Sequence, residues 1–107
     1  KLGLAADLTA QDWNDALEHF GHACAYCGDA GALQKEHLQA VSHGGEFTRR
    51  NIVPACVPCN QSKKDRALHD WYKFTPGYSD CRLLTIVGWL FGESGVRVVR
   101  ERFSLAI

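Results

Sequence analysis

The sequence lacks the features that mark a membrane protein, a secreted protein or a strongly basic nucleic-acid-binding protein. It has no apolar run of about 18 residues, the length from which a membrane-spanning helix is inferred, so no membrane partner is expected. Lys1 is not followed by a long apolar segment with a small-residue cleavage site, so no signal peptide is expected. The 12 basic and 12 acidic residues cancel. An argument for a nucleic-acid partner must therefore rest on local clusters of charge.

Length and composition fit one small domain. The chain has 107 residues, of which 46% are hydrophobic, and we expect a single domain with a modest core over residues 1–107. In this size range a bound metal often adds to the stability that burial provides. The sequence contains no internal repeat, low-complexity segment or interdomain linker.

The placement of the five cysteines indicates a metal site. Cys24 and Cys27 form one Cys-x-x-Cys pair, and Cys56 and Cys59 form a second pair after 28 intervening residues. Two such pairs supply four thiolates to a tetrahedral structural zinc ion and leave no open position for water. Two disulfides, or four buried free thiols, are the alternatives. Cys81 lies in an apolar segment, where we expect a buried small side chain and not a metal ligand.

The first part of the chain predicts one helix and one extended segment. Thr9 is a good N-cap, and Asp12 three residues later resembles a capping box. Apolar residues then recur at helical spacing until Gly21, so a helix is expected over about 9–20. An extended segment is expected over about 33–38.

The second part of the chain predicts a short strand and two helices. The strand, around residues 50–55, should be halted by Pro54. A polar helix with a solvated basic face is expected from residue 60 to about residue 71, and a strongly apolar helix over about 79–91. Residues 96–107 alternate in part, which leaves a strand and a short helix both open.

Between residues 24 and 65 the chain carries chemically distinctive residues in a fixed order. After the first cysteine pair these are Glu36-His37, Gly44-Gly45, Asn51-Ile-Val-Pro-Ala, Cys59-Asn60 and Lys63-Lys64. This series, over about two fifths of the chain, resembles the signature of the HNH endonuclease family. The resemblance implies an α+β fold, in which a small zinc-stapled ββα-metal core, with two short strands packed on the helix that begins near Asn60, carries additional flanking helices.

These residue types suit phosphodiester hydrolysis, which needs an activated water, positive charge near the phosphate and help for the leaving oxygen. A neutral imidazole accepts a proton near pH 7, so His37 is the candidate general base. The carboxylate of Glu36 and the amide oxygen of Asn60 are donors preferred by a hard divalent cation. The resemblance implies the same roles, and it adds Asn51 as the residue that braces the loop between the strands and so orients the base.

The chain departs from the family pattern at two positions. The residue before the histidine is commonly Asp in the family, whereas Glu36 stands here, and the third signature position is Asn60 where the family name implies His. Each residue still offers an oxygen ligand. A site without an imidazole ligand favours Mg²⁺ or Mn²⁺ over softer ions.

Basic residues gather around the motif. Between Phe47 and Lys73 there are six basic residues and only two acids, Asp65 and Asp70, so phosphate contact is expected there. Phosphate contacts carry no sequence information. We therefore expect double-stranded DNA as the partner, with little intrinsic sequence preference. The candidate DNA contacts are Arg49, Arg50, Lys63, Lys64 and Arg66.

The sequence thus predicts a metal-dependent DNA endonuclease, such as the nuclease domain of a restriction, phage or mobile-element protein. A non-catalytic, zinc-stabilised nucleic-acid-binding module is one alternative, although such a module has no need of the residues around His37. A zinc-stabilised protein-interaction domain, with Trp71, Trp89 and the apolar last helix as a docking face, is another. Cysteine usage favours a reducing, cytoplasmic location. The oligomeric state is left open, and a homodimer or fusion to a targeting domain is compatible with the sequence.

Overall fold

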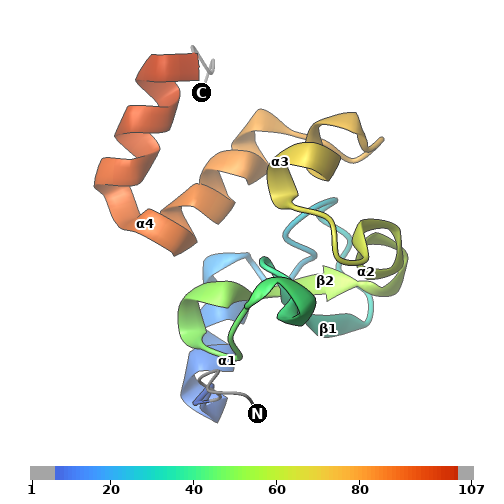
Figure 1. The fold of residues 1–107 in the computed structure, drawn as a ribbon. Coiled ribbons are helices and arrows are strands. Elements are labelled where there is room, and N and C mark those ends of the chain that lie inside the picture. The colour runs from blue at the N-terminus through green and yellow to red at the C-terminus, as the bar shows by residue number, and fades with distance from the viewer. Residues whose placement is uncertain (1–6, 104–107) are drawn as a thin grey trace.

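Short helices surround one pair of strands in the computed structural model, which describes residues 7–103 (Figure 1). The strands are β1 (Leu33–His37) and β2 (Ile52–Cys56), and the helices are α1 (Ala10–His19), α2 (Val57–Lys63), α3 (Leu68–Trp71) and α4 (Asp80–Phe103). Three 3-10 turns lie between them, η1 (Val41–His43), η2 (Arg49–Asn51) and η3 (Tyr72–Phe74). The predicted α+β class is confirmed, and β1, β2 and α2 follow one another as a ββα unit.

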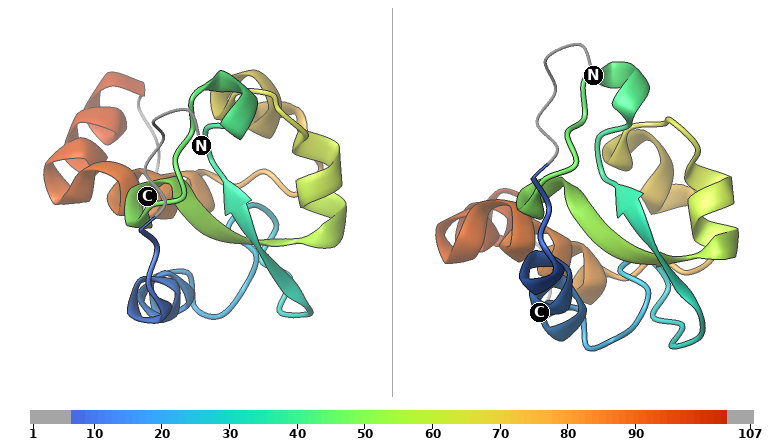
Figure 2. Two further views of the ribbon diagram at one scale, coloured as in Figure 1. Left: turned by 60° about the horizontal axis from the view of Figure 1, so that its bottom comes forward. Right: turned by 90° about the horizontal axis from the view of Figure 1, so that it is seen from below.

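The two strands form an antiparallel pair in which Leu33 lies opposite Cys56 and His37 opposite Ile52 (Figure 2). The prediction that Pro54 halts the second strand is wrong, because β2 continues through it to Cys56. In a two-stranded sheet both strands are edges, and an edge tolerates a residue without an N–H group. The Pro54 carbonyl accepts a hydrogen bond from the Ala25 amide at 2.8 Å, so its backbone groups face away from β1.

Helix α1 begins and ends as the sequence predicts. The Thr9 side chain accepts a hydrogen bond from the Asp12 amide, and the Asp12 side chain accepts one from the Thr9 amide, which completes the capping box. After the helix, Gly21 adopts a left-handed φ of 66°, a conformation that glycine takes without steric cost. The chain therefore turns back directly into the first cysteine pair.

Aromatic residues fill the core between the sheet and the helices. The Tyr26 ring meets the Trp71 ring edge-on at 4.9 Å between centroids. The Trp89 indole N–H bonds the carbonyls of Arg49 and Ile52, which ties α4 to the start of β2. Trp71 and Trp89 are only 4% and 5% exposed. These two tryptophans are therefore not available to the docking face that the alternative assigned to them.

The second half of the chain departs from the expected pattern. The polar helix is divided into α2 and α3, because Lys64 takes a left-handed φ of 53° and ends α2. The apolar helix continues past Gly92, where a φ of 74° separates two helical limbs, so the tail from residue 96 is helical as far as Phe103. In Figure 1 the second limb extends away from the strands. Cys81 is exposed on α4, so its predicted burial is also wrong.

Candidate metal centre and hydrolytic site

The four predicted zinc ligands converge on one point. Cys24 and Cys27 lie in the turn after α1, Cys56 ends β2 and Cys59 lies in the first turn of α2. All four sulfur atoms are within 4.8 Å of one another, and no cysteine forms a disulfide. At a Zn–S bond of about 2.3 Å, the edge of a tetrahedron is about 3.8 Å. The Sγ atoms of Cys27 and Cys56 are 3.7 Å apart, so the cluster fits a four-thiolate ion.

Backbone hydrogen bonds shape the first cysteine pair into a tight turn. The Gly28 amide bonds the Cys24 carbonyl at 2.9 Å, and Gly28 has the left-handed φ of 83° that this turn needs. The Cys24 amide bonds the Asp29 carbonyl at 2.8 Å. Burial opposes ionisation of the Cys24 thiol, but backbone N–H groups outweigh it and hold the pKa below its ordinary value. A lowered thiol pKa favours the thiolate that a metal requires, whereas burial raises the pKa of the Cys56 and Cys59 thiols.

Two residues that the sequence analysis did not single out support this turn. The Tyr72 hydroxyl donates to the Tyr26 carbonyl at 2.6 Å, and Arg82 donates to the same carbonyl at 3.1 Å. Arg82 also bonds the Gly77 carbonyl, so α4 is tied to the cysteine turn. No local pattern around Arg82 could have revealed this role, since its partner lies 56 positions earlier in the chain.

Glu36 lies on the face of β1 that packs against α2. Its side chain is 5% exposed, its Oε2 atom accepts a hydrogen bond from the Tyr26 hydroxyl at 2.6 Å, and the Lys63 Nζ atom is 3.4 Å from the same oxygen. Burial raises the pKa of Glu36, and the contacts from Tyr26 and Lys63 oppose that rise. The structure thus embeds one charged pair in the interior of the ββα unit.

The expectation that the basic face of the polar helix is solvated is wrong for Lys63. Its side chain is 0% exposed, and Nζ also donates to the His37 carbonyl at 3.0 Å. Buried in this way, the ammonium cannot act as one of the predicted phosphate contacts. Lys63 instead joins α2 to two consecutive residues of β1.

The oxygen atoms of Glu36 and Asn60 meet the requirements of a hard cation. The Asn60 amide nitrogen donates to Gln34 Oε1 at 2.8 Å, and Gln34 and Glu36 lie on the same face of β1. Among the described residues, no hydrogen bond is made to Glu36 Oε1 or to Asn60 Oδ1. No buried side-chain oxygen in that part of the chain lacks a partner, so Glu36 Oε1 must reach solvent. Glu36 and Asn60 therefore each offer one oxygen atom on the side of β1 that faces α2.

His37 leaves β1 on the opposite face from Glu36, because successive side chains of a strand alternate. It is half-buried at the end of β1, and its ring is 5.7 Å from the ring of Phe47. The structure therefore brings Glu36 to α2 and His37 to the loop that joins the strands. The two side chains flank the end of β1 from either side.

Asn51 braces that loop, as the resemblance implied. Its side-chain oxygen accepts from the Gln39 amide at 2.8 Å, and its nitrogen donates to the carbonyls of Gln39 at 3.0 Å and Glu46 at 2.9 Å. The paired glycines are needed for two different reasons. Gly44 has a φ of 89°, whereas a Cβ atom on Gly45 would lie 1.6 Å from the Gln39 carbonyl oxygen.

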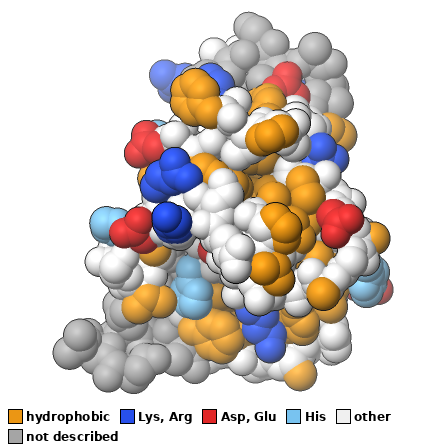
Figure 3. Space-filling model, turned by 90° about the vertical axis from the view of Figure 1, so that its right-hand side faces the viewer, with side chains coloured by type: hydrophobic (Ala, Val, Ile, Leu, Met, Phe, Trp, Pro, Cys, Tyr) orange, Lys and Arg blue, Asp and Glu red, His pale blue; other side chains and the backbone are white. Residues whose placement is uncertain are grey.

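Two of the predicted DNA contacts instead stabilise the fold. Arg49 forms an ion pair with Asp15 of α1 at 2.7 Å and stacks over the Trp89 ring. Arg50 donates to the Trp89 carbonyl at 2.8 Å. Lys64 and Arg66 are exposed. On the face shown in Figure 3, acidic and hydrophobic side chains separate the basic ones, so charge there is mixed.

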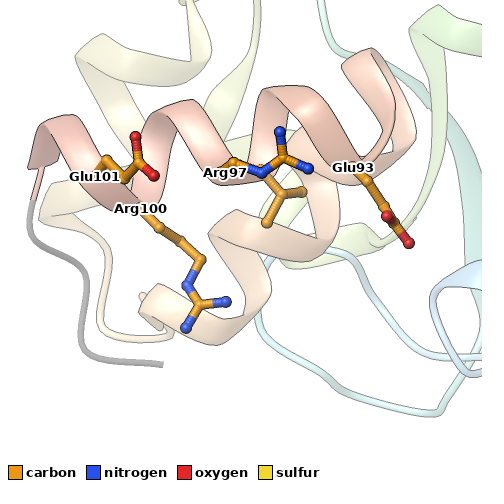
Figure 4. Close-up of a pocket in the computed structure, with 5 residues that line it drawn as sticks. Glu93, Arg97, Arg100 and Glu101 are labelled. Atoms are coloured by element: carbon orange, nitrogen blue, oxygen red, sulfur yellow. The ribbon is translucent and has the colours of Figure 1, made fainter.

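One surface hollow adjoins the motif and another lies away from it. One, of about 590 Å³, adjoins the braced loop and is lined by Leu38, His43, Asn51 and Arg66 among others, with His43 3.7 Å from Asp65. The other, of about 540 Å³, lies along the second limb of α4 beside Glu93, Arg97, Arg100 and Glu101 (Figure 4). The second hollow contains no residue of the motif.

A ββα unit held by a four-cysteine cluster defines a small metal-binding α+β domain. Residues 24–66 match the family model described as HNH endonuclease. The resemblance drawn from the sequence is therefore confirmed for this segment, which includes both cysteine pairs, β1, β2 and α2.

Two curated proteins are similar to the chain, and both come from phages or prophages. YoqL of Bacillus subtilis (strain 168), an SPbeta prophage-derived protein provisionally named an HNH endonuclease, is 34% identical over 96 residues, which cover 78% of this chain and 42% of YoqL. Protein ea31 of Escherichia phage lambda is 27% identical over 86 residues, covering 76% of this chain and 29% of ea31. The chain thus spans less than half the length of either relative. No solved structure matches it significantly.

No helix in the described part of the chain combines the length and apolar character needed to cross a membrane.

Proposed function

We propose that the chain is a DNA endonuclease domain that hydrolyses phosphodiester bonds with the help of one divalent cation. The observation that carries the proposal is the arrangement around β1, where His37 lies on one face and Glu36 lies on the other, the face on which Asn60 bonds to Gln34. This arrangement belongs to the segment that matches the HNH endonuclease model. The phage and prophage relatives favour a role in phage or mobile-element biology.

His37 is the proposed general base. A neutral imidazole nitrogen takes a proton from water, the water oxygen bonds to phosphorus, and the bond from phosphorus to one ester oxygen breaks. The leaving oxygen then takes a proton from solvent. Asn51 supports this step because its three hydrogen bonds fix the loop against which the His37 ring packs.

Glu36 and Asn60 are the proposed ligands of the cation, Mg²⁺ or Mn²⁺, which when bound supplies positive charge to the phosphate in the transition state. Oxygen donors without an imidazole are the set that these hard ions prefer. A phosphate in contact with both this pair and His37 must lie at the end of β1, where the two faces meet.

The cysteine cluster is proposed to hold zinc with a structural role. Four thiolates occupy every position of a tetrahedral ion, which leaves none for water or substrate. The ion joins the turn after α1 to the junction of β2 and α2, so it orients the helix that carries Asn60.

Lys64 and Arg66 are the proposed phosphate contacts, since they are the exposed basic residues that follow α2. Few such contacts imply weak DNA binding with a modest dependence on salt. Double-stranded DNA is the proposed substrate, and any sequence preference must come from elsewhere.

Plasmid cleavage by the zinc-loaded protein in Mg²⁺ or Mn²⁺ tests the proposal. His37→Ala should abolish cleavage, whereas His43→Ala, which changes an exposed histidine on the adjacent loop, should retain it. Asn60→Ala should raise the cation concentration needed for cleavage. A His37→Ala protein that cuts as fast as the parent would refute the assignment of the base. A parent protein that binds DNA without cutting it would favour the non-catalytic binding module.

A further inference from the structure

The Tyr26 hydroxyl and the Lys63 ammonium both contact the same oxygen of the Glu36 carboxylate, Oε2. The Tyr26 hydroxyl lies 2.6 Å from Oε2 and the Lys63 ammonium lies 3.4 Å from the same atom. Both donors are buried, Tyr26 at 1% exposure and Lys63 at 0%. Within residues 7–103, no hydrogen bond is made to the other oxygen, Oε1. The carboxylate is therefore held in one orientation by one of its two oxygens.

This asymmetry decides how Glu36 can bind a cation. A carboxylate with both oxygens free can rotate and bind an ion through either oxygen or through both. Because the Tyr26 hydroxyl and the Lys63 ammonium hold Oε2, only Oε1 is available to bind the ion. The carboxylate has therefore lost its rotational freedom before the ion binds. Partners that orient a ligand in this way are known to matter nearly as much as the ligand for metal affinity.

We propose that Tyr26 is a positioning residue for the cation site, whose hydroxyl holds Oε2 of Glu36 so that Oε1 binds the ion as a single ligand. This inference rests on the proposed function. Tyr26 lies between Cys24 and Cys27 within the first cysteine pair. The turn that holds the structural metal therefore also orients a ligand of the catalytic one.

The contacts of Tyr26 explain how it keeps this position. Its ring packs edge-on against Trp71, and its carbonyl accepts hydrogen bonds from Tyr72 and Arg82. Its backbone amide points at Cys24 Sγ, 3.4 Å away. With both ends of the residue fixed, the hydroxyl has little freedom to leave Glu36.

Tyr26→Phe removes the hydroxyl and keeps the ring. We expect the Kd for Mn²⁺, measured by electron paramagnetic resonance on protein already loaded with one zinc per chain, to rise about 10- to 100-fold. The Mn²⁺ concentration that gives half-maximal plasmid cleavage should rise by a similar factor. The zinc content should not change, because the cysteine sulfurs are untouched.

Tyr72→Phe is the matched control. It removes a buried hydroxyl whose hydrogen bond is also 2.6 Å long and which lies in the same core, but that hydroxyl contacts the Tyr26 carbonyl and not Glu36. Because Arg82 still donates to the Tyr26 carbonyl in this variant and the Tyr26 ring still packs on Trp71, the control should unfold more easily than the parent but bind Mn²⁺ with a Kd close to that of the parent. An equal loss of Mn²⁺ affinity in both variants would assign the effect to general destabilisation and overturn the proposal. An unchanged Kd in Tyr26→Phe would also overturn it.

A second measurement on the unmodified protein does not depend on whether the variant folds. In crystals soaked with Mn²⁺, the anomalous signal should lie against Oε1 of Glu36, with the Tyr26 hydroxyl still on Oε2. An ion on Oε2, or on both oxygens with the hydroxyl displaced, would overturn the proposal. If the parent binds Mn²⁺ in neither experiment, the proposed cation site itself is wrong and the inference falls with it.

Discussion

Replacing Lys63 with methionine tests whether the basic side chain nearest the motif serves the fold or the substrate. Methionine has a similar length and fills the same space, but it cannot pair with Glu36 or donate to the His37 carbonyl. Removing one partner of a buried ion pair costs about 3–5 kcal/mol, because the remaining charge stays buried without compensation. At roughly 4 °C per kcal/mol for a domain of this size, Tm should fall by at least about 12 °C.

The assay is guanidinium unfolding followed by circular dichroism at a fixed zinc concentration, with zinc content checked for each protein. Lys64→Met provides the matched control, since Lys64 is the adjacent residue and is exposed. An exposed substitution should change the free energy of unfolding by less than about 0.5 kcal/mol. If both variants lose the same stability, Lys63 is not the buried partner of Glu36 and the described packing of α2 on β1 is wrong.

Adding Glu36→Gln to the Lys63→Met protein sharpens this test. The neutral amide removes the uncompensated charge, so the double variant should regain at least about 1 kcal/mol relative to Lys63→Met alone. A double variant less stable than both single variants would show that the two side chains act independently.

Two further predictions concern the metal and the loop. Removing the structural metal with a strong chelator should unfold the domain, because zinc binding contributes on the order of 10 kcal/mol and a typical domain has only about 5–15 kcal/mol in total. An unchanged circular dichroism spectrum after measured metal loss would contradict this. Gly45→Ala should destabilise the protein more than Gly44→Ala, since its Cβ would overlap the Gln39 carbonyl, while Gly44→Ala costs about 1–2 kcal/mol for its left-handed φ. Equal unfolding midpoints for the Gly45→Ala and Gly44→Ala proteins would argue against the close approach of residue 45 to the Gln39 carbonyl.

Features with a local cause could be predicted from the sequence. The capping box of Thr9 and Asp12 acts within a single turn, and the spacing within each cysteine pair is set by the ion they share. The resemblance to the HNH endonuclease family implied the ββα unit, whose two strands and helix are consecutive in the chain. In each case the information lies in a few neighbouring residues.

Features that depend on distant partners could not be predicted. Lysine is rarely buried without a partner, and the partner of Lys63 becomes apparent only when α2 lies on β1. Arg49 likewise belongs to a basic cluster in the sequence but pairs with an acid of α1 in space. Pro54 does not end its strand, because β2 has a free edge at that position, which only the pairing of the two strands reveals. Local charge counting therefore overestimated the DNA-contacting surface.

The position of Cys56 limits how the chain length of this domain can vary. Cys56 is both the last residue of β2 and the N-cap of α2, and Asn60 follows four residues later. An inserted residue between Cys56 and Asn60 would rotate the amide by roughly 100° around the helix, away from Gln34 and Glu36. Insertions are tolerable in the exposed turn over residues 30–32 or in the linker after Lys64, where no metal ligand would be turned. Among homologues we therefore expect length differences at those two places and a constant spacing from the second cysteine pair to the asparagine.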